Sequence, residues 1–161
     1  MTFDATGKEK QLMTDASAIY RYIHAAEGEV TLVSPRTMKA HAYVFAEPKN
    51  KRDFPEDTIF VYALHNGHKM YLGLMDGSGF RRTQKSNFSE DTEIMKGARY
   101  IVKMASRQDV VNQKAMLLYH SGKCCMCGRK LDSDKALAQG IGSKCLKRYN
   151  IHLSETPWDG N

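Results

Sequence analysis

Apolar residues in the first third of the chain follow a helical period before they change to another one. After Asp15 they recur at steps of three and four residues, at Ile19, Tyr22, Ile23 and Ala26. This spacing predicts a helix that begins at Asp15, whose carboxylate can cap it, and ends at Gly28. Residues 1–14 are mostly polar, and we expect them to form a flexible N-terminus.

From residue 29 to residue 85 the period drops to two. The segment 29–46 predicts a hairpin around Ser34-Pro35, and the charged loop 47–57, which contains two prolines, connects it to the next strands. Two apolar runs then meet at Asn66-Gly67, the dipeptide that best supplies a two-residue hairpin turn, and a further strand is predicted for 80–85. These segments predict an antiparallel meander of about five strands.

A second helical pattern follows at 90–106. Its apolar face consists of Ile94, Ala98, Ile101, Val102 and Ala105, with Ser89 as the expected cap and acidic residues in the first turn. The fold class predicted is α+β, with a small antiparallel meander packed against helices and followed by a small zinc-knuckle module of treble-clef-like form. We expect an α+β domain at 15–106, a joint at 107–114, a zinc-binding module at 115–152 and a tail at 153–161.

Cysteine is concentrated in one part of the chain. Cys124, Cys125 and Cys127 lie within four positions, and Cys145 follows eighteen residues after Cys127. The chain shows no apolar run long enough to cross a membrane and no secretory leader, so we expect cytoplasmic action, in a bacterial cytosol. Because cysteines stay reduced there, this spacing indicates metal binding rather than disulfides.

The cysteine pattern predicts one zinc ion. Cys124 and Cys127 form C-x-x-C, and Gly128 permits the tight turn that directs both thiolates to one ion. Cys145 is the third ligand expected. The fourth has three candidates in the sequence: His120, four residues before Cys124; His152, seven after Cys145; and Cys125, whose side chain is expected to diverge from that of its neighbour.

The stretches YHSGKCCMCGRKL and ALAQGIGSKC resemble a zinc-binding domain family of unknown function, found mainly in phage and bacterial proteins. The family pattern runs H-x-G-x-C-x-x-C-G-R-x-L and then G-I-G-P-x-C. It is matched by His120, Gly122, Cys124, Cys127, Gly128, Arg129, Leu131, Gly140, Ile141, Gly142 and Cys145, and Ser143 stands in place of its Pro. Asp134 and Ala136 stand where Pro and Ser are common. The resemblance implies His120 as the fourth ligand and a phage-encoded protein.

Three cysteines and a histidine would complete a closed tetrahedral shell, which is typical of structural zinc. A zinc deaminase needs a glutamate two positions after its histidine, whereas Gly122 occupies that position here. We therefore expect no enzymatic activity and no small-molecule substrate.

The net charge of +6 arises entirely from the cysteine-containing part. Residues 107–149 contain nine Lys or Arg and three acids, whereas the rest of the chain has fifteen of each. Such a local excess is typical of a surface that contacts phosphates, although cations also compensate zinc-bound thiolates. The candidates are Lys123, Arg129, Lys130, Lys144, Lys147 and Arg148, together with Arg81, Arg82 and Lys85 in the expected last strand of the meander.

We therefore expect a non-enzymatic, zinc-containing protein that binds nucleic acid, either DNA or RNA, through a basic C-terminal module. Tyr119 and Tyr149 would stack on bases if they were exposed. The alternative is a protein-binding adaptor, or an inhibitor of a host complex, in which zinc is purely structural.

Overall fold

The computed structural model describes residues 11–14, 16–24, 27–106, 116–124, 127–139 and 141–148. Its elements in chain order are α1 (Ala16–Ile23), β1 (Glu27–Val33), β2 (Ala40–Ala46), the 3-10 turn η2 (Lys51–Asp53), β3 (Ile59–His65), β4 (His68–Asp76), β5 (Gly79–Arg82), α2 (Glu93–Ala105), β6 (Leu117–His120), α3 (Asp134–Gln139) and α4 (Ser143–Arg148). The predicted joint at 107–114 lies outside the described residues.

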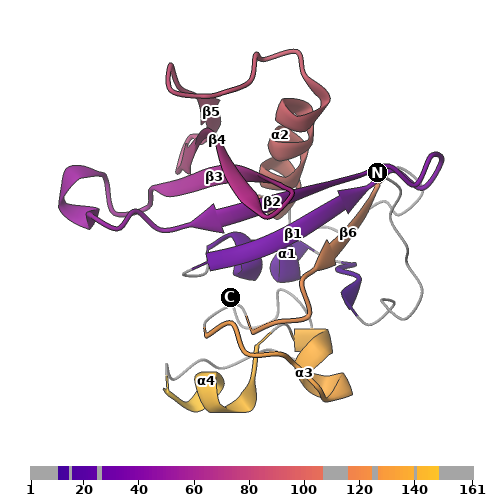
Figure 1. Ribbon diagram of the computed structural model, residues 1–161. Helices are drawn as coiled ribbons and strands as arrows, with labels where there is room; N and C mark the ends of the chain where they lie inside the picture. Colours follow the sequence, from indigo (N-terminus) through magenta and orange to yellow (C-terminus); the bar gives the residue numbers. More distant parts are fainter. Residues whose placement is uncertain are drawn as a thin grey trace.

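The six strands form one antiparallel sheet in the order β5-β4-β3-β2-β1-β6 (Figure 1). The predicted five-strand meander is confirmed as β1 to β5, and the turn at Asn66-Gly67 has positive φ at both residues, 50° and 80°. The sixth strand, β6, comes from the range assigned to the zinc module and pairs with β1, with His120 opposite Val30. The two sheet edges are therefore β5 and β6.

Both longer helices cover the same face of the sheet. Alternation along the strands points one set of side chains at α1 and α2, where they form the fully buried centre of the core with Ile19, Ile23, Met95 and Ile101. The sheet contributes Val30, Leu32, Tyr43, Phe45, Val61, Ala63 and Leu118 to this set. Helix α2 lies close to the sheet at Gly97, where an added Cβ would overlap the Tyr43 hydroxyl.

Three element boundaries differ from the sequence prediction. Helix α1 ends at Ile23, and Gly28 lies inside β1, where the Tyr22 carbonyl approaches too closely for any Cβ. The cap of α2 is Thr92, whose hydroxyl accepts the Met95 N–H, whereas Ser89 donates to Asp91. Strand β5 ends at Arg82, so Lys85 lies in the turn after it. The side chain of Asp15 lies outside the described residues.

The segment before α1 is joined to the edge of the sheet. Leu12 forms a bridge with Tyr119, the Met13 N–H donates to the Leu118 carbonyl at 2.7 Å, and the Met13 side chain is buried. Residues 11–13 thus cover part of the outer edge of β6, although the sequence predicts flexibility across 1–14. Within the described ranges, no helix is both long and apolar enough to cross a membrane.

Candidate metal centre

The chain after β6 folds into a tight hairpin that presents two cysteines. Lys123 and Lys130 form a β-bridge, the Cys124 N–H donates to the Arg129 carbonyl at 2.8 Å, and the Gly128 N–H donates back to the Cys124 carbonyl at 2.9 Å. Gly128 has φ +77°, a conformation that glycine adopts without strain. The sequence prediction that this glycine permits the turn is confirmed.

A short helix brings the third cysteine to the hairpin. Cys145 lies in the first turn of α4, and its N–H donates to the Gly142 carbonyl at 3.1 Å. The Gly142 N–H in turn donates to the Cys124 sulfur at 3.4 Å. Ile141, fully buried, and Leu131 anchor this arrangement in the same apolar cluster that contains the sheet core.

The sulfurs of Cys124, Cys127 and Cys145 all lie within 4.8 Å of one another. This separation lets one ion contact all three, and a thiolate set of this kind suits zinc. Cys124 and Cys145 are buried, whereas Cys127 is exposed. Burial, hydrogen bonds among the sulfurs and their mutual repulsion raise the pKa of the Cys145 thiol to about 12. A cation bound among the three sulfurs would favour their thiolate forms.

His120 does not belong to this group of sulfurs. Its ring is buried, its Nδ1 accepts the Gly122 N–H at 3.0 Å, and its Nε2 lies 2.7 Å from the Leu137 carbonyl. Because a carbonyl can only accept, Nε2 carries the proton. Burial lowers the pKa of His120, which keeps the ring neutral. Both ring nitrogens are thus engaged with the backbone, and the assignment of His120 as the fourth ligand stays a prediction.

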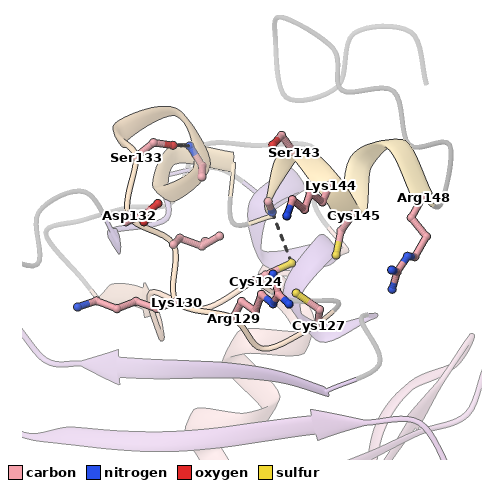
Figure 2. Close-up of a pocket in the computed structure, with 13 residues that line it drawn as sticks. Cys124, Cys127, Arg129, Lys130, Asp132, Ser133, Ser143, Lys144, Cys145 and Arg148 are labelled. Carbon is pink, nitrogen blue, oxygen red and sulfur yellow. Dashed lines mark hydrogen bonds between the residues drawn. The ribbon is translucent and has the colours of Figure 1, made fainter.

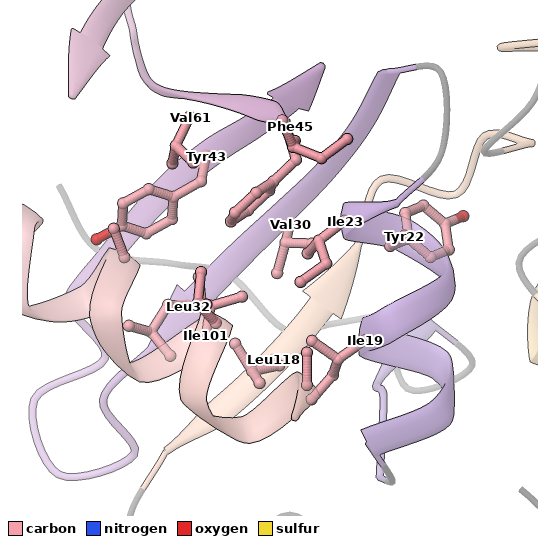
Figure 3. Packing of buried hydrophobic residues seen from close by; sticks show 14 of the residues in the cluster. Ile19, Tyr22, Ile23, Val30, Leu32, Tyr43, Phe45, Val61, Ile101 and Leu118 are labelled. Atoms are coloured by element: carbon pink, nitrogen blue, oxygen red, sulfur yellow. The ribbon is translucent and has the colours of Figure 1, made fainter. Parts of the chain in front are cut away.

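Tyr22 of α1 connects the sheet domain to the cysteine hairpin. Its ring stacks on His120 with centroids 5.0 Å apart, and its hydroxyl donates to the Lys123 carbonyl at 2.7 Å. Figure 3 shows Tyr22 at one end of the buried cluster, with its hydroxyl pointing away from the core residues. The carbonyl that it binds belongs to the residue before Cys124, so α1 holds the hairpin directly.

A hollow of roughly 520 Å³ opens beside the sulfurs (Figure 2). All three cysteines lie on its wall, together with the cations Arg129, Lys130, Lys144 and Arg148 and with Asp132. The four cations are exposed, and none of them forms a salt bridge with another described residue. The hollow therefore combines three sulfurs that lie close enough to hold a metal ion with a positive lining.

The other predicted cations lie elsewhere. Lys123 and Lys147 are exposed but do not line this hollow. Arg81 and Arg82 lie on β5, at the opposite edge of the sheet from β6, which leads into the hairpin. Arg81 pairs with Asp76 at 3.5 Å, and the Arg82 Nε donates to the Phe88 carbonyl. The two predicted basic groups are thus not brought together.

The aromatic residues expected near the cations are also placed differently. Tyr119 is only 6% exposed, so it does not offer a ring for stacking on bases. On β5, Phe80 beside Arg81 also packs inward, under Arg99. Cys125, Tyr149 and His152 lie outside the described residues.

Sequence reasoning missed the role of Tyr22. A signal was present, because Leu118 and His120 alternate with Tyr119, and this period of two places His120 on the helix-facing side of β6. A histidine buried on that side packs against side chains of the helices that cover it. Tyr22 lies on the apolar face predicted for α1, so it could have been proposed.

Part of the chain matches the model of a known protein family. Residues 119–150, which is 32 of the 161 residues, match the model described as "Family of unknown function (DUF6011)". This stretch holds His120 and all four cysteines, and it supports the predicted resemblance of this part to an uncharacterised domain family. Neither the curated proteins nor the solved structures contain a match to the chain. Phage origin stays a prediction.

Proposed function

We propose that the chain is a zinc-containing protein that binds nucleic acid through the positive surface around its cysteine cluster. The observation that carries the proposal is the hollow in which four exposed cations surround three neighbouring sulfurs. Zinc is the metal favoured by a thiolate set in a compartment that keeps cysteines reduced. We propose cytosolic action because cysteines stay reduced in the cytosol and are free to bind metal there.

The metal's role in this proposal is to hold the hairpin and α4 together in a treble-clef-like arrangement. The hairpin contributes two thiolates, and the third comes from the first turn of the helix, about as in zinc modules that fold only with metal. Zinc binding in such modules contributes on the order of 10 kcal/mol. A part of the chain with few buried side chains of its own thereby gains enough stability to stay folded. The proposal includes no catalytic step.

The positive charge exceeds what the metal centre itself requires. Zinc with three thiolates carries one net negative charge, which a single cation would compensate. Among the described residues of 116–148 there are seven Lys or Arg and two acids, an excess of five. An excess this large, on side chains that form no salt bridges there, is better suited to a row of phosphates.

Charge reversal tests the proposal. Lys144→Glu with Lys147→Glu changes two exposed positions of α4 and no cysteine. We expect nucleic-acid affinity at least about tenfold weaker in a gel-shift titration, and a salt dependence of binding reduced by a slope of about two, since two phosphate contacts are lost. Zinc content should be unchanged.

The matched control is Lys96→Glu with Lys103→Glu. It makes the same change in net charge at two exposed positions of α2, which lies on the sheet and away from the hollow. The control should bind almost as wild type does. Unchanged affinity in the α4 variant, or an equal loss in both variants, would defeat the proposal. A host partner whose capture survives nuclease and high salt would instead support the adaptor or inhibitor alternative.

A further inference from the structure

We infer that the fourth position of the metal is not filled by His120 but faces the basic hollow, where an oxyanion of the phosphate class binds between the metal and the surrounding cations. The inference rests on the proposed function in one respect, because it requires a metal at Cys124, Cys127 and Cys145. It goes further by assigning the chemistry of the ligand and the residues that hold it.

Both ring nitrogens of His120 already have backbone partners. To bind the metal, His120 would have to release either the Gly122 N–H from Nδ1 or the Leu137 carbonyl from Nε2, and Leu137 belongs to α3. It would also leave its stack on Tyr22, whose hydroxyl fixes the hairpin through Lys123. Each lost bond leaves a partly buried polar group without its partner, which is unfavourable. The His120 ring therefore links β6 to α3 through its hydrogen bond with the Leu137 carbonyl.

The hollow beside the three sulfurs has room for a ligand. A volume of roughly 520 Å³ lies against the three sulfurs, and Cys127 is exposed on its wall. One water molecule occupies about 30 Å³ in the liquid, and a bare zinc ion is no larger, so the hollow has room for the ion and for a tetrahedral oxyanion beside it. The three sulfurs would thus hold a metal from one side, and the hollow would give an anion access to it from the other.

The lining of the hollow is mainly positive. Arg129 comes from the hairpin, and Lys144 and Arg148 come from α4, so cations reach the hollow from both walls (Figure 2). Guanidinium groups suit phosphate because they offer paired N–H donors in a fixed plane. Asp132 is the one acid among the described lining residues. This lining favours a dianion over a neutral ligand.

Cobalt-substituted full-length protein provides the test. Co²⁺ reports thiolate ligands through its charge-transfer absorption and reports the fourth ligand through its visible d–d bands. We expect absorption for three thiolates, and a saturable shift of the d–d bands when inorganic phosphate is added. An unshifted spectrum, or a spectrum of four thiolates, as ligation by Cys125 would give, overturns the inference.

Two variants extend the test. Arg148→Gln should lower the affinity for phosphate, measured from the d–d band shift, about tenfold, since a charged hydrogen-bond partner of the anion is lost. The thiolate absorption should stay unchanged. Lys103→Gln on α2 is the control and should bind phosphate as wild type does. Equal phosphate affinity in the Arg148 variant and in wild type contradicts the assignment.

His120 is tested without relying on a variant that could misfold. Nitrogen-15 spectra of histidine-labelled, zinc-loaded wild-type protein should show His120 protonated at Nε2, with neither nitrogen bound to metal. A metal-bound nitrogen at His120 or at His152 would overturn the inference.

The source of the phosphate is resolved with oligonucleotides of one sequence that carry either a 5′-phosphate or a 5′-hydroxyl. A larger shift of the d–d bands with the 5′-phosphate assigns the site to strand ends, and equal shifts assign it to internal phosphodiesters; both support the inference. If inorganic phosphate shifts the bands and neither oligonucleotide does, the phosphate site stands and the proposed nucleic-acid function fails.

Discussion

Tyr22→Phe should weaken metal binding through the backbone that leads into Cys124. The substitution removes one hydroxyl that donates to the Lys123 carbonyl at 2.7 Å and retains the ring that stacks on His120. Because the carbonyl belongs to the residue before Cys124, this bond stabilises the hairpin in the conformation that presents two of the three thiolates.

The magnitude follows from linkage. A hydrogen bond of this kind contributes about 0.5–1.5 kcal/mol net. If it forms only when the hairpin has its ligating conformation, the same free energy is lost from metal binding. That corresponds to an affinity weakened roughly two- to thirteenfold, since 1.4 kcal/mol is a factor of about ten.

Tyr43→Phe is the matched control. Its hydroxyl donates to the Ile94 carbonyl at 2.8 Å, between the sheet and α2 rather than to the backbone of the hairpin. Competition titration against a chromophoric chelator, under conditions where both variants are folded, should show weaker zinc binding for Tyr22→Phe alone. Both should lose a similar free energy of unfolding. Wild-type zinc affinity in Tyr22→Phe would refute the coupling between α1 and the hairpin.

Two further outcomes are expected. Gly97→Ala should destabilise the fold, because a Cβ there overlaps the buried Tyr43 hydroxyl. Overpacking of this kind costs about 1–3 kcal/mol, which outweighs a gain in helix propensity of about 1 kcal/mol or less. In urea denaturation, adding Tyr43→Phe should recover part of the lost stability, and purely additive losses would contradict the clash. Zinc affinity should rise between about pH 6 and about pH 8, by up to about tenfold per pH unit for each proton displaced. The reason is that the pKa of Cys145 is raised to about 12, so its thiol must lose a proton to bind the metal. Zinc affinity that does not change with pH over that range would exclude thiolate ligation.

The sheet was predictable because its signals are local. Alternating apolar residues and the Asn66-Gly67 turn act within a few positions, and they predicted β1 to β5 with small errors at the ends. The errors at Gly28 and Ser89 have tertiary or competing local causes. Gly28 lies in β1, where it pairs with Phe45 and the Tyr22 carbonyl leaves no room for a side chain, and Ser89 bonds Asp91 while Thr92 supplies the cap.

The cluster of three cysteines was predictable because the spacing of these residues in the sequence marks them. C-x-x-C with Gly128 and a distant Cys145 predicted three sulfurs in one place, and the structure brings them together. The surroundings of His120 depend on α1 and α3, which lie far from it in sequence, so the stack on Tyr22 and the bond to the Leu137 carbonyl could not be read from the cysteine motif. Likewise, charge alone did not separate the cations of the hollow from those that pair within the fold, such as Arg81.

Metal content of the purified chain tests the central claim most directly. Elemental analysis of wild-type protein beside Cys145→Ser should return about one zinc per wild-type chain and far less in the variant, since three thiolates around one ion give the affinity that two cannot. Wild-type protein that is folded and contains no zinc, and that takes up none when zinc is added, would contradict the account.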